Sequence, residues 1–405
     1  MKHFPYVIVG ASIAGLSAVQ AIRSRDPSGE ILLIHGEQGL PYKRTQLSKR
    51  IAKGFAVHEI ALFPESWYAE MHVELLREAK AISLDPSARE LALDTGEIVG
   101  YDNLLLATGA APTRLAIPGC EHLRYLRWID HAETLAQLLK DTRQAVSIGF
   151  GVLGIELADQ FRAAGVETTL MGNQERLMVD YLDLTASRRL ESRVTGSGVT
   201  VTRCARIVEV QRRNQEYWIV APGIEKHAQL VTACVGASPV TELAALAGIP
   251  LADDVHQGIR VDRSMHTGVE GIFAAGDAAS PLPGASWGLW HSSEVAGMIA
   301  GANMAGEEYC PEPRPYRLKC EVFGGYVFSM NYLAASRDVQ AQKTVLLDSP
   351  AVYLAAWARA GHSTAAVLDL SSDPGGDRTR LLGKKIERSL LEGVRARDIP
   401  QALGI

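Results

Sequence analysis

Two kinds of hydrophobic pattern alternate along the chain. Stretches in which apolar and polar residues alternate predict half-buried strands, and they cover 75–112 and 197–233. Short apolar runs predict buried strands, and they lie at 7–9, 30–34, 101–107, 145–148, 167–171, 230–235 and 271–275. Buried strands separated by helical segments are typical of parallel sheets, so the pattern predicts an α/β fold.

The remaining segments are expected to form a loop, a long helix, a linker and a C-terminal region. Gly and Pro predict a loop over 39–50. A helix is expected from about Trp290 to Met304, and Pro311, Pro313 and Pro315 mark a linker after it. Beyond the linker we expect strands at 322–331, 344–356 and 365–370, a loop at 373–377 and a helix at 379–391.

The first apolar run turns directly into a helix through Gly10, Ser12 and Gly15. Gly10 allows the tight turn, the small Ser12 lets backbone approach a pyrophosphate, and Gly15 lets the helix pack against the strand. The helix N-terminus presents N–H groups and the positive end of its dipole to phosphates. Glu37, after the second run, is the acid expected to bind a ribose hydroxyl. These residues predict a dinucleotide site, and a strand–helix turn that merely tolerates glycine is the alternative.

A full GxGxxG motif, formed by Gly149, Gly151 and Gly154, follows the strand at 145–148 and opens another helix. In this context it predicts a second dinucleotide site. The position that ends the next strand, where NAD-selective folds carry an acid, is Gly172. Arg176 alone is weak support for a clamp on a 2′-phosphate. Because no basic cluster replaces the acid, we favour NADH over NADPH.

Composition narrows the function classes further. The chain has 405 residues, 47% of them hydrophobic, and a net charge of −5, which argues against a nucleic-acid partner. No apolar run is long enough for a membrane span, and the N-terminus leads straight into the first strand, so we expect a cytoplasmic protein. The five cysteines form no CxxC pair or zinc-type cluster, so we expect neither a metal site nor a dithiol relay.

From Val7 to Lys49 the chain resembles the FAD-binding start of the pyridine-nucleotide-dependent ferredoxin and rubredoxin reductases, which carry a PYxRxxLSK-like loop at the position of 41–49. The strand that ends in Thr108-Gly109 and the Gly276-Asp277 pair are similar to further motifs of these flavoproteins. The resemblance implies an α/β protein with two Rossmann-like domains, for FAD and NAD(P), and a C-terminal α+β interface domain. The implied boundaries are 1–112 with 243–312 for FAD, 113–242 for NAD(P) and 313–405 for the interface domain.

The resemblance also implies which residues bind the cofactors. For the nicotinamide coenzyme they are Gly149, Gly151, Gly154 and Glu156. Lys49 and Glu156 would form an ion pair behind the point where flavin N5 meets nicotinamide C4, where they would orient the rings for hydride transfer; two ordinary surface charges are the alternative. For FAD the implied residues are Gly10, Ser12, Ala14, Gly15, Glu37, Arg44, Lys49, Ala81, Thr108, Gly109, Arg127, Gly276, Asp277, Leu289 and Lys319.

In that family a hydride passes from the reduced nicotinamide to the flavin, and single electrons pass on to an iron–sulfur protein or rubredoxin. We therefore expect an NAD(P)H-dependent FAD reductase with a rubredoxin or ferredoxin as partner. Direct reduction of oxygen or a small molecule is one alternative, and a non-catalytic redox-sensing flavoprotein that binds a partner through its C-terminal domain is another. The cations of 378–388 are a candidate docking face for an acidic carrier, or simply a solvated helix face.

Three departures from the family pattern bear on this expectation. Gly36 and Gly172 stand where the family carries acids. Binding of the FAD ribose, the role of the acid at the position of Gly36, therefore passes to Glu37 or is lost. The C-terminal part lacks the tryptophan–serine–aspartate stretch of typical ferredoxin reductases of this group, and this leaves the electron acceptor open.

Overall fold

A computed structural model describes residues 1–54, 56–204, 206–253, 257–280, 287–312, 315–371 and 377–403. Pro313, most of the loop expected at 373–377 and the side chains of Arg378 and Arg380 lie outside the described residues. The chain divides into two compact units, the first from 1–46, 55–111 and 237–315, the second from 47–54, 112–236 and 316–405. Among the described residues, no helix combines the length and apolar character needed to cross a membrane.

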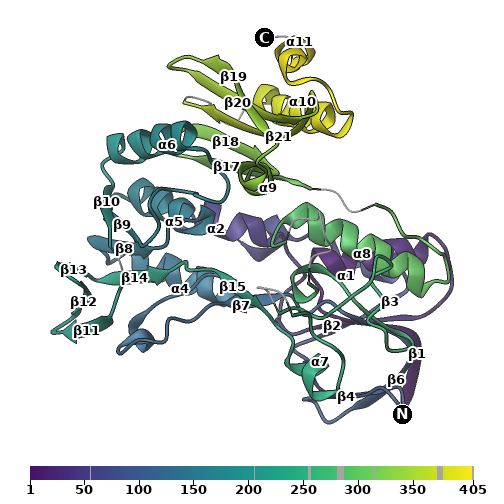
Figure 1. The fold of residues 1–405 in the computed structure, drawn as a ribbon. Coiled ribbons are helices and arrows are strands. Elements are labelled where there is room, and N and C mark those ends of the chain that lie inside the picture. Colours follow the sequence, from purple (N-terminus) through teal and green to yellow (C-terminus); the bar gives the residue numbers. More distant parts are fainter. Residues whose placement is uncertain are drawn as a thin grey trace. The chain divides into compact units, whose positions relative to one another are not determined.

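The first unit is built on a parallel sheet in the order β3-β2-β1-β6 (Figure 1), and β16 pairs with β6. The strands are β1 (Lys2–Val9), β2 (Ile31–His35), β3 (Val73–Arg77), β6 (Ile98–Leu106) and β16 (Ile272–Ala274). Strands β4 (Ala81–Asp85) and β5 (Glu90–Leu93) extend it beyond β6 with antiparallel pairing. The expected meander over 75–112 is therefore only partly right, because β3 pairs in parallel with β2 instead of joining β4.

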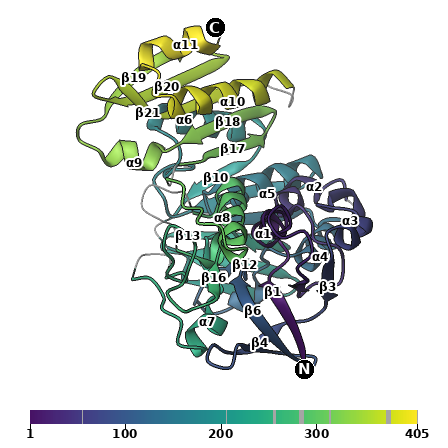
Figure 2. The ribbon, with the colours of Figure 1, turned by 90° about the vertical axis from the view of Figure 1, so that its right-hand side faces the viewer.

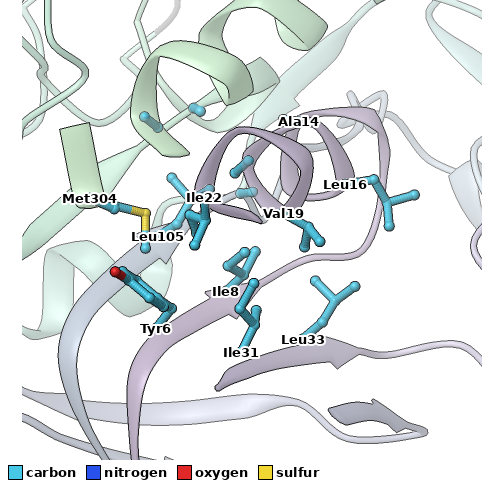
Figure 3. Close-up of a cluster of buried hydrophobic side chains, with 14 of the residues drawn as sticks. Tyr6, Ile8, Ala14, Leu16, Val19, Ile22, Ile31, Leu33, Leu105 and Met304 are labelled. Atoms are coloured by element: carbon cyan, nitrogen blue, oxygen red, sulfur yellow. The ribbon is translucent and has the colours of Figure 1, made fainter. Parts of the chain in front are cut away.

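Two helices, α1 (Ile13–Arg23) and α8 (Trp290–Met304), lie against each other over one face of this sheet. Figure 3 shows α1 side chains such as Leu16 and Val19 pointing onto Ile8, Ile31 and Leu33 of the sheet. The helices approach backbone to backbone, since a Cβ on Gly297 would lie 2.1 Å from the carbonyl oxygen of Ala14. Short elements complete the unit: η1 (Arg44–Gln46), η2 (Val57–Ile60), α3 (Glu65–Glu70), β7 (Ala110–Pro112), β15 (Ala237–Pro239), α7 (Glu242–Leu246) and η4 (Gly276–Ala278).

The second unit repeats the same parallel order, β10-β9-β8-β14. Its strands are β8 (Gln144–Ile148), β9 (Glu167–Gly172), β10 (Thr200–Arg203) and β14 (Leu230–Ala233), accompanied by α4 (Ile129–Leu139), α5 (Val152–Ala163), α6 (Leu184–Gly196) and η3 (Cys120–His122). An antiparallel sheet of β11 (Glu209–Arg213), β12 (Glu216–Ala221) and β13 (Ile224–Ala228) is inserted before β14. The two parallel sheets confirm the expected pair of Rossmann-like folds.

The C-terminal part of this unit is an antiparallel sheet in the order β17-β18-β21-β20-β19 (Figures 1 and 2). Its elements are β17 (Arg317–Val322), β18 (Gly325–Met330), α9 (Tyr332–Arg337), β19 (Gln342–Asp348), β20 (Val352–Arg359), β21 (His362–Leu370), α10 (Asp377–Leu391), η5 (Ala396–Asp398) and α11 (Ile399–Leu403). Helix α10 packs on one face through Ile386 and Leu390. On β21, Leu368 joins this cluster, so the next residue, Asp369, points to the opposite face.

That opposite face is held to α6 by buried charge. Asp369 is fully buried, and its carboxylate accepts hydrogen bonds from Arg189 Nε and an Arg193 guanidinium nitrogen, each at 2.9 Å. Asp183 is the N-cap of α6, and its carboxylate accepts a hydrogen bond from the Ala186 amide. It also accepts a hydrogen bond from the Tyr353 hydroxyl at 2.5 Å. Side chains of the C-terminal sheet are thus bonded directly to α6 and its N-cap, beside the parallel sheet of the same unit.

The strand expected at 322–331 is β18, preceded by a turn from the end of β17, whereas the one expected at 344–356 is parts of two strands, β19 and β20, joined by a turn. Phe323 and Gly324 both have positive φ (49° and 69°), the backbone that a two-residue hairpin turn requires. Likewise β19 ends at Asp348, and the Ser349 amide donates to the Val352 carbonyl as the chain reverses into β20. The prediction of a loop over 39–50 is also partly wrong, because its end forms the helix α2 (Leu47–Arg50). This helix buries Leu47 and packs on α5.

Candidate dinucleotide and hydride-transfer sites

The glycine loop after β1 is fixed by the backbone around it. Gly10 has a φ of 112°, and a Cβ on it would lie 2.1 Å from the Ala107 carbonyl oxygen. A Cβ on Gly15 would lie 2.1 Å from the Gly10 carbonyl oxygen. Ser12 is the N-cap of α1, and its side chain makes no capping hydrogen bond, while Ala14 is buried in the first turn. This is the close backbone turn at a helix N-terminus that a pyrophosphate needs.

Glu37 follows β2 and is held by two neighbours from the next loop. Its Oε1 accepts from Arg44 and its Oε2 from the Tyr42 hydroxyl, both at 2.7 Å. Burial acts to raise the pKa of Glu37, but the Arg44 charge and these two hydrogen bonds outweigh it and lower the pKa. The carboxylate is therefore ionised and oriented, as a hydroxyl-binding acid must be.

Most of the other residues expected at the flavin lie on separate elements of the first unit, whereas Lys49, Arg127 and Lys319 belong to the second. Thr108 donates to the Val240 carbonyl at 2.6 Å, beside Gly109, whose φ is 75°. Gly276 lies against α1, since a Cβ there would be 3.0 Å from the Ala14 Cβ, and Asp277 accepts from Ser293 of α8 at 3.2 Å. The N-cap of α8 is Leu289, and Ala81 begins β4 and pairs with Leu93. Close contacts thus join Gly15 to Gly10 and Gly276, the neighbour of Asp277, to Ala14. These contacts do not include Ala81.

The GxGxxG loop of the second unit repeats the geometry of the first. Gly149 has a φ of 123°, and a Cβ there would lie 2.2 Å from the Cys234 carbonyl oxygen. A Cβ on Gly154 would lie 2.1 Å from the Gly149 carbonyl oxygen. A Cβ on Gly151, by contrast, would meet nothing within 4 Å. Among the described residues, no atom therefore fills the space next to Gly151 at the N-terminus of α5. Both loops fit a dinucleotide pyrophosphate. Arg127, which the resemblance assigns to the flavin, is half-buried just before α4.

Lys49 and Glu156 form an ion pair within the second unit, with Lys49 Nζ 3.0 Å from Glu156 Oε1. The second carboxylate oxygen accepts from Ser48 Oγ at 2.5 Å. Burial acts to lower the pKa of Lys49, but the charge and hydrogen bond of Glu156, together with the nearby Cys320 and Glu321, outweigh it and raise the pKa, so the ammonium keeps its proton. The Arg44 and Lys49 side chains, both expected at the flavin, belong to different units, since Arg44 pairs with Glu37.

Three further groups surround this ion pair, and the sequence analysis assigned none of them. Ser48 precedes Lys49 in the loop motif, and Asp159 lies three residues after Glu156 on the same face of α5, where its carboxylate accepts from the Phe323 amide at 3.0 Å. Cys320, on β17, lies near enough for the Lys49 and Glu156 charges to act on its thiol, whose pKa burial raises well above its ordinary value. The helical spacing of Glu156 and Asp159 could have suggested one of these groups. Lys319 is exposed on β17, and strand alternation directs it away from Cys320.

Comparison with known proteins identifies the family. The chain belongs to the pyridine nucleotide-disulphide oxidoreductase family, whose model matches residues 4–300. It is similar to the biphenyl dioxygenase system ferredoxin–NAD(+) reductase component of Paraburkholderia xenovorans, 32% identical over 276 residues that cover 67% of each protein. A rubredoxin–NAD(+) reductase of Pseudomonas putida is 31% identical over 278 residues, 67% of this chain and 71% of that one.

A solved structure gives the fold over nearly the whole length. A ferredoxin reductase from Rhodopseudomonas palustris matches with a TM-score of 0.85 at 24% identity, covering 98% of this chain and 100% of that one. The expected fold and the resemblance to ferredoxin and rubredoxin reductases are confirmed. The chain is an oxidoreductase that uses FAD and a nicotinamide dinucleotide.

Proposed function

We propose that this chain takes a hydride from NAD(P)H and delivers electrons to a small redox protein of the ferredoxin or rubredoxin kind. The observation that carries the proposal is the repetition of one glycine-loop geometry on two parallel sheets, with Glu156, on the helix that opens from the second loop, paired to Lys49 of α2. When bound, FAD accepts two electrons as a hydride and can release them singly to a one-electron carrier. Relatives named as ferredoxin and rubredoxin reductases support the same acceptor class.

We assign the cofactor contacts to the residues expected from the sequence. In the first unit the loop from Gly10 to Gly15 would hold the FAD pyrophosphate, Glu37 a ribose hydroxyl and Asp277 the ribityl chain. In the second unit Gly149, Gly151 and Gly154 would hold the nicotinamide coenzyme. We keep the expected domain boundaries. The FAD domain would comprise 1–112 and 243–312, the NAD(P) domain 113–242 and the interface domain 313–405.

We assign a positioning role to Lys49 and Glu156 at the nicotinamide end of the coenzyme. The raised pKa of Lys49 and the two hydrogen bonds to Glu156 support a pair that stays ionised and does not exchange protons during the hydride step. A fixed pair of charges can orient a carboxamide and a ring, and orientation alone supplies a large part of many enzymatic rate enhancements.

The acceptor is a protein and not a disulfide substrate in this proposal. The five cysteines of the chain are unpaired, and they include no CxxC motif that could relay electrons as a dithiol. Unpaired thiols also support a cytoplasmic location, where thiols are kept reduced. For docking we propose the face of α10 that carries Lys384, Lys385 and Arg388, because a basic face attracts an acidic carrier.

The test is an anaerobic absorbance titration of the purified protein with NADH and then NADPH. We expect a yellow protein that is bleached by one equivalent of coenzyme and recovers its colour when an oxidised ferredoxin or rubredoxin is added. A colourless protein that also fails to bind added FAD would contradict the proposal. Rapid reoxidation by air alone, with no acceleration by any carrier protein, would instead support the oxidase alternative.

A further inference from the structure

The strand that selects between coenzymes in Rossmann folds ends here in a glycine that has no room for a side chain beside Phe150. Gly172 is the last residue of β9, where NAD-selective domains carry an acid that binds the ribose 2′-hydroxyl. A Cβ on Gly172 would lie 2.6 Å from Phe150 Cγ, and 2.7 and 2.9 Å from the two Cδ atoms. Carbon atoms do not approach so closely without repulsion, so a side chain at 172 and the ring of Phe150 exclude each other.

Phe150 is buried, and its backbone is fixed. It is the middle residue of Gly149-Phe150-Gly151 and is 1% exposed. Its carbonyl oxygen accepts from the Met178 amide at 2.9 Å, which fixes its backbone to the segment that follows β9. The ring therefore occupies the space that a carboxylate on residue 172 would need.

The charged groups near Gly172 do not replace the missing acid. Glu175 is the next acid along the chain, but its side chain is 77% exposed and its carboxylate accepts from Arg176 at 2.9 Å. The Arg176 side chain is 13% exposed and donates to the carbonyls of Val179 and Leu182 and to the Tyr332 hydroxyl. Arg176 is thus committed to the protein, and the expectation of a 2′-phosphate clamp at this residue has no support in these contacts.

The residue directly beside Gly172 on the neighbouring strand is a cation. Arg203 of β10 is in register with Gly172, and its side chain is 44% exposed. Its Nε donates to the Glu175 carbonyl at 2.9 Å, and a second guanidinium nitrogen lies 2.5 Å from a Glu191 carboxylate oxygen. The edge where a 2′-substituent is recognised therefore carries a half-exposed guanidinium and no carboxylate on residue 172.

We propose that Phe150 sets the coenzyme selectivity of this protein: by excluding an acid at 172, it leaves a site that binds NADPH as well as NADH, with affinities within about tenfold of each other. An acid at 172 would favour NADH through a hydrogen bond and would reject NADPH through repulsion of its 2′-phosphate. Without the acid both effects are lost, and the half-exposed Arg203 beside Gly172 attracts the phosphate, although Glu191 offsets part of its charge. This inference replaces the preference for NADH expected from the sequence, and it rests on the proposed function, which places a nicotinamide coenzyme at the second glycine loop.

The experiment measures equilibrium binding of NAD⁺ and NADP⁺ to the full-length FAD-loaded protein by calorimetry, without turnover. Wild type is compared with Phe150→Ala, Gly172→Asp and the double variant, and melting temperatures are recorded for all four. We expect a wild-type ratio of dissociation constants within about tenfold, and a Gly172→Asp variant that melts earlier without becoming selective. In the double variant the ring is gone and the acid fits, so we expect a shift of about tenfold or more toward NAD⁺, whereas Phe150→Ala alone keeps the wild-type ratio.

Arg203→Gln supplies a second, independent comparison. We expect weaker binding of NADP⁺ with little change for NAD⁺, because only the phosphate is lost as a partner. Equal weakening of both coenzymes would mean that Arg203 only holds the loop through Glu175 and Glu191, and it would remove Arg203 from the inference.

The outcomes separate the inference from the function on which it rests. A wild-type preference of about a hundredfold for either coenzyme would overturn the inference, and this measurement needs no variant to fold. A folded double variant with an unchanged ratio would overturn it as well. If the wild type bound neither coenzyme, the proposed nucleotide site itself would be wrong.

Discussion

Glu156 has both of its carboxylate oxygens bonded to consecutive residues of α2, Lys49 on Oε1 and Ser48 on Oε2. Two partners on the two oxygens prevent the carboxylate from rotating, and it holds the ammonium in one place in turn. A buried ion pair is costly unless such hydrogen bonds complete it. The arrangement therefore serves precise placement better than it serves stability.

Replacement of Lys49 tests this placement. For Lys49→Met we expect the rate of anaerobic flavin reduction by NADH to fall between about 10- and 100-fold, because a coenzyme displaced by an ångström reacts far more slowly. Stopped-flow absorbance measures this rate. The matched control is Lys53→Met, an exposed lysine of the same segment, which should keep the wild-type rate. A wild-type rate in Lys49→Met would exclude Lys49 from the hydride step.

His35, the last residue of β2, gives stability a pH dependence. It is 3% exposed, and its Nε2 has no hydrogen-bond partner within the described part of the chain. Burial lowers the pKa of His35 to about 4, below the 6.5 of an exposed histidine. Between these two pKa values, His35 therefore binds a proton in the unfolded chain but not in the folded chain. The stabilising contribution is complete above about pH 6.5 and is lost progressively as the pH falls toward 4.

We expect the wild type to lose up to about 3 kcal/mol of unfolding free energy from this residue between pH 6.5 and pH 4. The His35→Leu variant should show a flatter profile over the same window. Denaturant unfolding at a series of pH values measures both. Identical slopes for the two proteins would mean that His35 does not titrate on unfolding in this range.

At the scale of elements, the contact of α1 with α8 depends on residues that have no side chain. Gly297 and Gly301 face Ala14 and Ala18, and Cβ atoms on them would lie 2.1 and 2.4 Å from the carbonyl oxygens of those two residues. The same α1 opens from the first glycine loop. The packing of α8 therefore fixes the helix whose N-terminus is expected to hold the FAD pyrophosphate.

For Gly297→Ala we expect a loss of about 2 kcal/mol or more in unfolding free energy, together with a lower FAD content after purification, since the added methyl group has no space. Thermal unfolding and the ratio of flavin to protein absorbance report the two effects. Gly196→Ala in α6 is the matched control, because a Cβ there meets nothing within 4 Å and alanine favours a helix. Equal behaviour of the two variants would contradict the close packing of α8 on α1.

The elements that follow from local sequence were predicted well, and those that depend on distant partners were not. The glycine turns at Gly10 and Gly149 and the helix at 290–304 agree with the structure, because backbone conformation and helical pattern are local properties. Helix α2 was missed because its burial against α5 decides its shape. The same reason hides Ser48 and Cys320, which reach Glu156 from separate elements only after folding, whereas Asp159 lies on the same helix as Glu156.

At the scale of the whole molecule, charge is unevenly distributed. The chain carries a net charge of −5, yet the exposed side chains of α10 include Lys384, Lys385 and Arg388. Exposed Leu381 and Leu391 lie on the same helix. Such a mixture of cations and apolar groups suits a transient contact with an acidic protein, whose approach the charges accelerate.

The double variant Lys384→Glu/Lys385→Glu tests the docking face. We expect a several-fold slower reduction of an acidic ferredoxin and a weaker dependence of the rate on salt, with unchanged reduction of a small inorganic acceptor. Steady-state kinetics over a range of ionic strength measure both effects. Lys140→Glu, an exposed lysine after α4, is the control that should retain the wild-type salt dependence. A double variant that behaves like this control would move the docking site elsewhere.

The discontinuity of the first unit imposes an order on events at the ribosome. Helix α1 is synthesised early, but Gly297 and Gly301, which cover it, belong to a segment made after the strands β8 to β14 of the second unit. The parallel sheet β10-β9-β8-β14 can close as soon as Ala233 has emerged, whereas the first unit lacks β16 and α8 until much later. In the growing chain, we therefore expect this sheet of the second unit to close before the first unit is complete; under the proposed cofactor assignment, FAD would be captured only after α8 has emerged.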